Sequence, residues 1–384
     1  MFDLKRFQVN KRVEAALKKN HPWIFKNQCS TALGGLKIGS LVRLLGPTNN
    51  FLGIGIYEPL GAIAIRVFQW EDILIDEKYF FRKLLKAHNK RLKYLASYNT
   101  NAYRLIHGEA DGFPGLTIDI FDKTAIVVFY LKSWKEILKN ILEKELMEIG
   151  IEKIYVKEPH GNGGEGDITK PIQFIENSCP FLAWPLSGLK TGFFLDLREV
   201  RLALAHLVKE GDTMLNLFAN DGNLSVISKS LGAQKVISVE QHETSKTQAQ
   251  ALFDLWEIPF EDKNWITDDV WKYLEKETDE KFDVIILDPP SLSTQKKQKG
   301  NLANTWKFLH INSFKRLKPG GKLISISCTE RLSKEDQIKY TLESAKTLEQ
   351  KIKLIQKIGP SFDHPELKSL PERNYFRALV WEIK

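Results

Sequence analysis

Apolar residues in the second half of the chain follow two spacings that alternate along the sequence. From Gly188 onward, stretches with apolar residues at helical spacing are separated by short, continuous apolar runs. The pattern predicts helices at residues 196–207, 243–255, 305–317 and 334–347, and strands at 214–218, 236–239, 284–287, 322–327 and 378–381. Such alternation is typical of an α/β domain in which a parallel-type sheet carries helices on both faces.

The first 70 residues carry a different pattern. One amphipathic helix is predicted at 13–19, and β-type runs follow at 41–45, 51–57 and 62–68. Turns that contain glycine and proline separate these runs. Short strands joined in this way predict a small, β-rich domain.

The stretch between these regions combines both patterns. A long basic helix is predicted at 77–95, and the order strand-strand-strand-helix-strand follows, with its helix at 134–148. The glycine-rich segment 161–166 lacks the Lys-Ser/Thr pair of a P-loop, and we interpret it as the tip of a hairpin. We therefore predict three domains: a β-rich domain at 1–70, a linker helix with an α+β middle domain at 71–187, and the α/β domain at 188–384.

Candidate chemistry begins in the β-α-β unit at residues 212–240. A buried strand runs to Phe218, a polar turn contains Asp221 and Gly222, and the next strand ends on Glu240. An acid at this place can accept hydrogen bonds from ribose hydroxyls, although it can equally be an ordinary surface residue. Because the turn is not G-x-G-x-x-G, a nucleoside without phosphates fits better than a dinucleotide. S-adenosylmethionine is such a ligand.

A second apolar run, 282–287, leads into Asp288, Pro289 and Pro290. Two prolines cannot continue a central strand, so the chain must leave the sheet there. Ligands of open α/β sheets lie at the carboxyl ends of the strands. An acid at this end therefore supports a Rossmann-like class I methyltransferase domain, with a simple strand end as the alternative.

Composition narrows the class of protein. The 384 residues include 56 Lys and Arg against 48 Asp and Glu, a formal charge of +8, which permits a nucleic-acid partner without requiring one. Three scattered cysteines argue against a disulfide framework and a zinc site, and we expect no metal. No apolar run reaches the length of a membrane span, so we expect a cytoplasmic protein without a membrane partner.

Basic and aromatic residues mix in the first 95 residues. Lys11, Arg12 and Lys26 lie near Trp23 and Phe25 in the β-rich domain, and the helix at 77–95 carries seven Lys or Arg residues. Such a mixture can hold RNA by charge and stacking. A solvated basic face over core aromatics is the alternative explanation.

Longer motifs resemble one family. They are NHPWIF from Asn20, HGEADGFPGL at 107–116, KTGFFLDLR at 190–198, LNLFANDGN at 215–223, LDPPS at 287–291, SISC at 325–328 and DHPE at 363–366. Over essentially its whole length the chain resembles the 23S rRNA large-subunit methyltransferase I family. These are class I enzymes with an N-terminal PUA domain that form 5-methylcytosine. The resemblance implies an S-adenosylmethionine cofactor, an rRNA substrate and a role in rRNA processing; a homodimer is a candidate assembly.

Methylation of cytosine at carbon 5 needs a nucleophile, because that carbon is itself unreactive; a thiolate that adds to carbon 6 solves the problem. Cys328 follows a predicted strand and, with the resemblance, is the expected nucleophile, while Cys29 and Cys179 are expected to be inert. Asp288 is expected to hold the methionine amino group or the cytosine. The expected catalytic residues are thus Cys328 and Asp288.

Strand positions and the resemblance together imply the cofactor contacts. Glu240 is assigned to the ribose. Asp268 and Asp269 suit the adenine amino group equally by chemistry, and register with the family favours Asp269. Asp196 and Arg198 are expected at the cofactor entrance. The complete expected set is Asp196, Arg198, Asn216, Phe218, Asp221, Gly222, Glu240, Asp269, Asp288 and Pro289.

The cofactor turn departs from the family. Where the family usually has Thr-Gly-Gly, this chain has Asp221-Gly222-Asn223. We expect Asn223 to adopt the left-handed backbone of the missing glycine, and Asp221 to add a charge near the sulfonium or the methionine amino group.

Two other functions stay open from the sequence. A related catalytic domain could methylate guanine N7 or an exocyclic nitrogen of RNA without a cysteine nucleophile. An RNA-binding ribosome assembly factor with weak catalysis is the second alternative.

Overall fold

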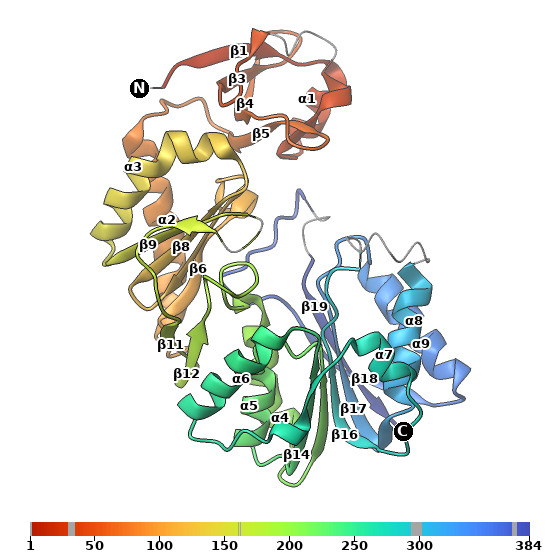
Figure 1. Ribbon diagram of the computed structural model, residues 1–384. Coiled ribbons are helices and arrows are strands. Elements are labelled where there is room, and N and C mark those ends of the chain that lie inside the picture. The colour runs from red at the N-terminus through yellow and green to blue at the C-terminus, as the bar shows by residue number, and fades with distance from the viewer. Residues whose placement is uncertain (1, 30–34, 160, 162, 293–301, 371–374) are drawn as a thin grey trace. The chain divides into compact units, whose positions relative to one another are not determined.

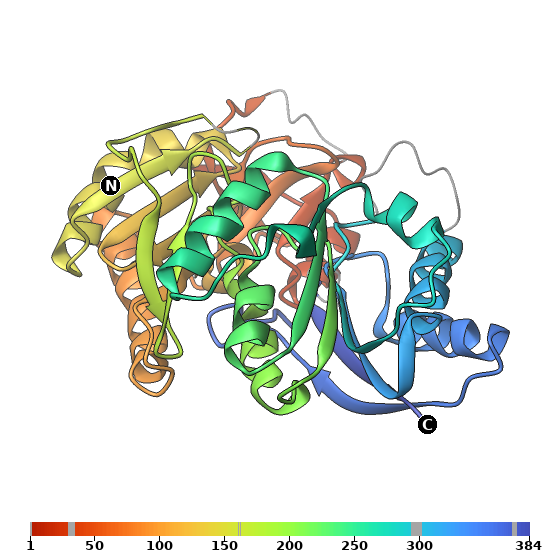
Figure 2. The same ribbon diagram turned by 60° about the horizontal axis from the view of Figure 1, so that its bottom comes forward.

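The computed structural model describes residues 2–29, 35–159, 161, 163–292, 302–370 and 375–384. The chain forms two compact units, one of residues 1–195 with 362–371 and one of residues 196–361 with 372–384 (Figures 1 and 2). No helix in these described ranges is long and apolar enough to cross a membrane.

The first unit begins with a five-stranded sheet in the order β1-β3-β4-β5-β2. Its elements are β1 (Leu4–Gln8), α1 (Lys11–Leu17), β2 (Trp23–Phe25), the 3-10 turn η1 (Lys26–Gln28), β3 (Leu41–Leu45), β4 (Phe51–Tyr57) and β5 (Ile63–Gln69). Val13 and Leu17 of α1 pack on Val42, Leu44 and Ile65 of the sheet. The predicted β-rich domain is confirmed. Sequence patterning missed β1 and β2, which are edge strands of five and three residues.

A second sheet, in the order β10-β9-β8-β7-β6, and a two-stranded sheet of β11 and β12 lie in the rest of this unit. The elements are α2 (Glu77–Leu95), β6 (Ala102–His107), η3 (Gly108–Asp111), β7 (Leu116–Phe121), β8 (Thr124–Phe129), α3 (Lys132–Glu148), β9 (Lys153–Lys157), β10 (Gly164–Glu165), β11 (Ile172–Glu176) and β12 (Cys179–Ala183). The order strand-strand-strand-helix-strand is as predicted. β9 and β10 pair in antiparallel fashion, which agrees with a hairpin around the glycine-rich segment.

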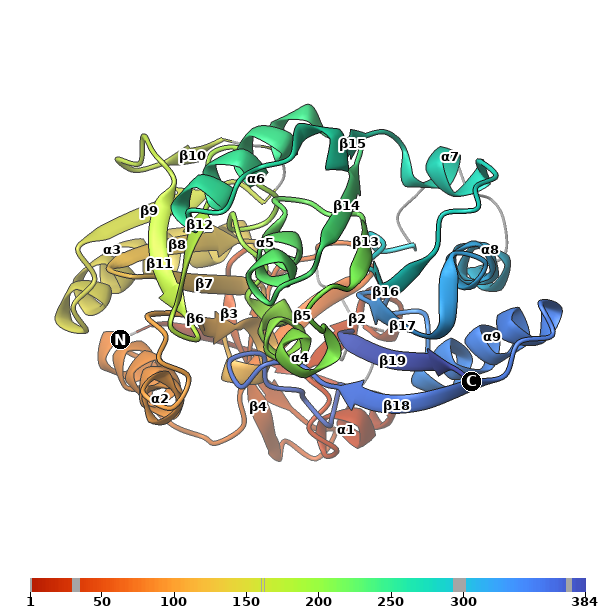
Figure 3. The same cartoon turned by 90° about the horizontal axis from the view of Figure 1, so that it is seen from below.

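The second unit is built on a seven-stranded sheet in the order β15-β14-β13-β16-β17-β19-β18. Its strands are β13 (Thr213–Leu217), β14 (Lys235–Glu240), β15 (Trp265–Thr267), β16 (Phe282–Leu287), β17 (Leu317–Ser327), β18 (Ile352–Ile358) and β19 (Arg377–Ile383). Its helices are η4 (Leu195–Leu197), α4 (Arg198–Leu207), α5 (Asn223–Ser230), α6 (Glu243–Leu255), η5 (Asp262–Asn264), α7 (Val270–Glu275), α8 (Leu302–Phe314) and α9 (Lys334–Thr347). Figure 3 shows α4, α5 and α6 on one face of the sheet and α7, α8 and α9 on the other. The α/β fold with helices on both faces is confirmed.

Two details of this sheet differ from the predictions. The five strands from β13 to β17 are parallel, but β19 pairs antiparallel with both β17 and β18. The predicted helix 305–317 is α8, which ends at Phe314, because Leu317 already pairs with Phe282 as the first residue of β17. An apolar residue such as Leu317 suits a helix and a strand equally well, and only the pairing decides.

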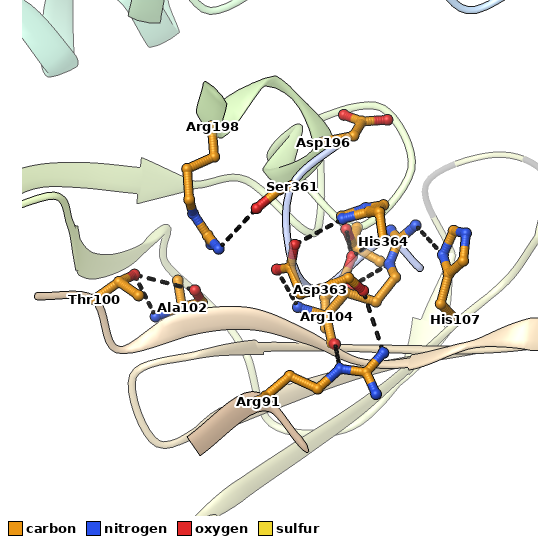
Figure 4. Close-up of polar contacts among 12 residues, drawn as sticks. Arg91, Thr100, Ala102, Arg104, His107, Asp196, Arg198, Ser361, Asp363 and His364 are labelled. Carbon is orange, nitrogen blue, oxygen red and sulfur yellow. Dashed lines mark hydrogen bonds and ion pairs between the residues drawn. The ribbon is translucent and has the colours of Figure 1, made fainter. Parts of the chain in front are cut away.

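A short C-terminal segment, Phe362–Pro371 (the 363 segment), belongs to the first unit, although the chain on both sides of it belongs to the second. Asp363 Oδ2 accepts a hydrogen bond from the Arg104 backbone N–H at 2.9 Å, and its carbonyl oxygen accepts one from Arg91 Nη2 at 3.2 Å (Figure 4). Arg91 also forms a two-bond ion pair with Asp111, at 2.8 and 2.7 Å. The side chains of this pair are 2% and 1% exposed. This buried charge cluster holds α2, β6 and the 363 segment together.

Candidate active site

Three expected site residues lie side by side where the central strands end. Leu217 of β13 pairs with Val239 of β14 and with Leu287 of β16. The residues one position further along these strands are Phe218, Glu240 and Asp288. The sheet order also changes direction here, since β14 lies on one side of β13 and β16 on the other. Ligands of open α/β sheets bind at such a switch point.

Glu240 organises the backbone around the end of β14. Its Oε1 accepts hydrogen bonds from the backbone N–H groups of Gln241 at 2.8 Å and His242 at 3.1 Å, and its Oε2 accepts one from Asn220 at 3.1 Å. The last bond ties the β13 turn to the end of β14. The carboxylate is therefore fixed in place at the mouth of the turn, with oxygen lone pairs left for a further donor.

The turn after β13 contains residues with a left-handed backbone, but Asn223, for which the sequence predicted this conformation, is not one of them. Phe218, Asn220 and Gly222 have φ angles of 62°, 48° and 73°, whereas Asn223 begins helix α5. A Cβ on Gly222 would lie 2.9 Å from the Ala249 Cβ, so the turn needs glycine there. The expectation for Asn223 was wrong because Asn220 and Gly222 already supply the reversals.

Asp221 points into the protein, and Asn223 is its partner. Its Oδ1 accepts hydrogen bonds from the Asn223 backbone N–H at 3.2 Å and side-chain Nδ2 at 2.5 Å. Burial raises the pKa of Asp221, and the bonds from Asn223 and the charge of Arg201 oppose that rise. The two departures from the family motif thus act as a pair: the acid holds the amide in place under the turn.

Asn216 lies beneath the turn, inside the layer between sheet and helix. Its Nδ2 donates to Ser225 Oγ of α5 at 2.9 Å, and Ser225 Oγ lies 2.8 Å from Ser238 Oγ of β14. Asn216 and Ser238 are also paired in register. This polar chain joins β13, α5 and β14, so Asn216 supports the turn from below. Polar residues at matching positions of two apolar strands were the signal by which Ser238 could have been found.

The two residues expected at the cofactor entrance are buried at the start of α4. Asp196 Oδ2 accepts a hydrogen bond from the Tyr375 hydroxyl at 2.9 Å, and Arg198 Nη1 donates to Ser361 Oγ at 3.2 Å. Asp196 is 3% exposed and Arg198 is fully buried. Both partners come from the C-terminal part of the unit, so these side chains also join α4 to distant sequence.

Asp269 caps helix α7. Its Oδ1 accepts the Trp271 backbone N–H at 2.7 Å. Asp268 instead pairs with Lys276 at 2.7 Å, and this lysine lowers the pKa of Asp268. Trp271 packs edge-on against Phe218, with ring centroids 6.3 Å apart. Asp269 therefore lies at the end of β15, next to the packed rings of Trp271 and Phe218. The Asp268 carboxylate instead forms an ion pair at the surface.

Cys328 follows the last residue of β17, and the loop after Asp288 is tied to the same place. The backbone N–H of Leu292 donates to Thr329 Oγ at 3.2 Å, which joins the Asp288-Pro289-Pro290 loop to the residue after the cysteine. In the sheet, Leu287 pairs with Ser325, three residues before Cys328. Cys328 is partly exposed. The structure therefore brings the expected nucleophile and Asp288 to the same edge of the sheet.

The other two cysteines lie in the first unit and are poor nucleophiles. Cys29 donates to the Phe25 carbonyl oxygen at 3.5 Å, and Cys179 begins β12. Burial raises the pKa of both thiols, and Glu176 adds to the rise for Cys179. A raised pKa leaves less thiolate at neutral pH.

The buried His310 of α8, which the sequence did not single out, contacts Ser325 of β17. His310 Nε2 lies 2.8 Å from Ser325 Oγ, and its Nδ1 lies 2.8 Å from the Trp306 carbonyl oxygen. Burial lowers the pKa of His310 to about 4, so the ring is neutral at pH 7. It fixes the strand that precedes Cys328 without carrying charge into the core.

No group of three or more His, Cys, Asp or Glu residues suited to a metal occurs in the described ranges. His107 belongs to the buried charge cluster, where its ring lies 5.0 Å from that of His364. Burial, then the nearby His364 and Arg104, lower the pKa of His107 well below its ordinary value.

Comparison with known proteins agrees with this arrangement. A family described as a PUA-like domain matches residues 7–70, and one described as conserved hypothetical protein 95 matches residues 197–344. Ribosomal RNA large subunit methyltransferase I of Alteromonas mediterranea is 29% identical over 96% of this chain and 96% of its own. Its counterpart from an Enterobacter species is 28% identical over 98% and 99%. A crystal structure described as a methyltransferase complexed with SAH superposes with a TM-score of 0.87 at 20% identity, covering 99% of this chain and 100% of that one. The chain is therefore similar over nearly its whole length to ribosomal RNA large subunit methyltransferase I proteins, and it is a SAM-dependent rRNA methyltransferase with a PUA-like domain at its N-terminus.

Proposed function

We propose that this enzyme methylates carbon 5 of a cytosine in large-subunit ribosomal RNA through a covalent bond to Cys328. The observation that carries the proposal is the position of Cys328 at the end of β17. There the Leu292–Thr329 hydrogen bond ties its neighbour to the loop that follows Asp288. The substrate class follows from the relatives, which are named as ribosomal RNA large subunit methyltransferases.

The turn after β13 suits the cofactor. Bound S-adenosylmethionine supplies an electrophilic methyl group. Glu240 offers carboxylate oxygens at the end of β14 for the ribose hydroxyls, and Asp269 lies one strand further for the adenine amino group. Asn223 Oδ1 is buried and accepts no hydrogen bond from any described residue. Such an acceptor suits the methionine ammonium, so the residues present fit the cofactor.

The chemistry at cytosine would proceed by nucleophilic catalysis. The Cys328 thiolate adds to carbon 6, which turns carbon 5 into a nucleophile that takes the methyl group. A base then removes the proton on carbon 5, and the bond between sulfur and carbon 6 breaks. Asp288, at the end of the neighbouring strand β16, holds the cytosine or the methionine amino group.

The three predicted domains receive separate roles in this proposal. Residues 1–70, which include the PUA-like domain, bind RNA. Residues 71–187 connect it to the catalytic part, and residues 188–384 bind the cofactor and carry Cys328. Methylation of guanine N7 or an exocyclic nitrogen would leave Cys328 without a task.

Nucleoside mass spectrometry tests the reaction. We expect deletion of the gene to remove one 5-methylcytosine from large-subunit rRNA, and a plasmid copy of the wild type to restore it. A copy with Cys328→Ser should fail to restore it. Loss of a 7-methylguanosine or an N-methylated nucleoside instead would refute the carbon-5 reaction, and unchanged rRNA would refute the substrate.

The role of Glu240 is tested by calorimetry with S-adenosylmethionine. We expect Glu240→Ala to weaken binding by about 1.5–3 kcal/mol, the scale of a hydrogen bond to a charged group. Glu243→Ala is the matched control, because this exposed acid lies three residues away at the start of α6. Thermal unfolding of both variants shows whether the turn still folds. Wild-type affinity in a folded Glu240→Ala protein would exclude the ribose assignment.

A further inference from the structure

The outer face of helix α2 is strongly basic. Eight of its side chains are exposed, and five of these are cations while one is an acid at the first residue. The exposed set is Glu77, Lys78, Arg82, Lys86, Asn89, Lys90, Leu92 and Lys93. Figure 3 shows α2 beside β6, at the edge of the β10-β9-β8-β7-β6 sheet. Its other face is buried through Tyr79, Phe80, Leu84, Ala87 and Arg91.

The five cations form one row. Lys78, Arg82, Lys86 and Lys90 are each four residues apart and Lys93 follows three residues later, so all lie on one side of the helix. At 1.5 Å per residue the row is about 22 Å long. None of the five forms an ion pair among the residues that the structure describes. Like charges at this spacing oppose helix formation, so the row carries a cost that a polyanionic partner would remove.

The neighbouring helix α3 shows what an ordinary solvated face looks like in this unit. Its exposed cations Lys132, Lys139 and Lys144 alternate with exposed acids, namely Glu136, Glu143 and Glu148. Lys135 and Lys139 also pair with Glu165, at 2.6 and 3.5 Å. The two helices have similar lengths and a common core, yet only α2 lacks interspersed acids. Solubility alone does not account for the difference.

The residue types indicate which polyanion fits. Arg82, Leu85, Lys86, Asn89, Lys90 and Lys93 line a shallow, open depression along the helix. No aromatic side chain lines this depression, and the aromatic residues of α2 are buried or half-buried, so the face offers cations rather than exposed rings on which a base could stack. Single-stranded RNA is usually held by such stacking, whereas duplex RNA is held mainly through its phosphates and its shape.

We propose that the row Lys78, Arg82, Lys86, Lys90 and Lys93 binds the phosphates of a double-stranded RNA segment that flanks the methylated nucleotide. The inference rests on the proposed RNA substrate and adds a binding surface outside both the PUA-like sheet and the α/β sheet. It holds the substrate by charge alone and therefore without sequence preference.

Salt-dependent binding of a plain RNA duplex tests the surface. The probe is a duplex of about 16 base pairs and arbitrary sequence, and its affinity for the full-length protein is measured from about 50 to 200 mM KCl. The α2 variant combines R82Q, K86Q, K90Q and K93Q. The control variant combines K132Q, K135Q, K139Q and K144Q of α3, which removes the same charge from the same unit. Thermal unfolding confirms that both variants fold.

For the α2 variant we expect the slope of log K against log salt to fall by about three, and the affinity to fall roughly tenfold or more. The α3 variant should keep a slope within about one of the wild type. Equal losses in both variants would mean that only net charge matters, and no loss in the α2 variant would mean a solvated face. Wild-type protein that binds a single strand or anionic phosphatidylglycerol vesicles in preference to the duplex would also overturn the proposal.

The rRNA assay separates this inference from the proposed function. If the gene controls 5-methylcytosine but the α2 variant methylates rRNA with the wild-type KM, the α2 surface is refuted and the function stands. If the α2 variant loses duplex binding but no rRNA nucleoside depends on the gene, the surface stands and the function is refuted.

Discussion

Replacing Cys328 with serine is expected to lower the methylation rate by roughly 10³-fold or more, the scale at which removing a covalent nucleophile acts. Carbon-5 methylation needs a soft nucleophile at carbon 6, and a serine hydroxyl is far weaker than a thiolate at neutral pH. Of the three thiols, only Cys328 directly follows a strand of the α/β sheet. The rate is measured with radiolabelled S-adenosylmethionine and rRNA, and Cys29→Ser and Cys179→Ser serve as controls that should retain activity.

The role of Cys328 can also be tested without measuring a rate, by trapping the covalent adduct between the enzyme and the RNA. Cytosine that carries fluorine at carbon 5 cannot lose that substituent after methyl transfer, so the bond to the cysteine persists. The wild-type enzyme with such RNA should migrate as a denaturation-resistant complex, and the Cys328→Ser enzyme should not. If the Cys328→Ser enzyme methylates at the wild-type rate, the carbon-5 mechanism is refuted. Methylation of guanine N7 or of an exocyclic nitrogen then takes its place.

The second large effect concerns stability. Changing Asp111 to asparagine should destabilise the first unit by about 3–5 kcal/mol, because it leaves the buried Arg91 guanidinium without its counter-charge. The loss should appear as faster hydrogen exchange in α2 and β6, which Arg91 joins through the Arg104 carbonyl oxygen at 3.0 Å. Exchange followed by mass spectrometry reports this unit separately, which a single unfolding midpoint of a chain with two units does not.

Two further variants give the Asp111 prediction its controls. Replacing both partners, Arg91→Met with Asp111→Leu, should recover much of the loss, because no buried charge is then left unpaired. Lys123→Met breaks an ion pair with Glu152 whose side chains are about 60% exposed, and it should leave exchange in α2 unchanged. Equal exchange in the Asp111→Asn and Lys123→Met proteins would show that the buried pair contributes little.

Local sequence patterns predicted the helices whose boundaries depend on residues close to them in the chain. The helices α2, α6 and α9 span the residues that spacing predicted, 77–95, 243–255 and 334–347. Two of them carry a capping side chain directly before the first residue: Asp76 accepts the Tyr79 N–H, and Ser333 accepts the Asp336 N–H. Their boundaries depend on neighbours within four residues, which a sequence displays openly.

Contacts between segments that are distant in the chain could not be predicted from the sequence. Nothing near Asp363 indicates that it accepts a hydrogen bond from Arg104, 259 residues earlier. Spacing likewise did not show that Asp221 would turn inward to Asn223, or that Asn216 would bond to Ser225 beneath the turn. Which way a short polar side chain points is decided by the partners that burial leaves within reach.

By itself, then, the sequence determined the order of strands and helices apart from the edge strands β1, β2 and β18, together with the chemistry available at the strand ends and the motifs that indicate a methyltransferase. The tertiary structure alone decided that Phe218, Glu240 and Asp288 meet at one edge, that β19 runs antiparallel, and that the 363 segment joins the first unit. The physical reason is the range of the forces involved. Helical spacing and turns arise from neighbours in sequence, whereas strand register and buried polar pairs arise between segments that folding brings together.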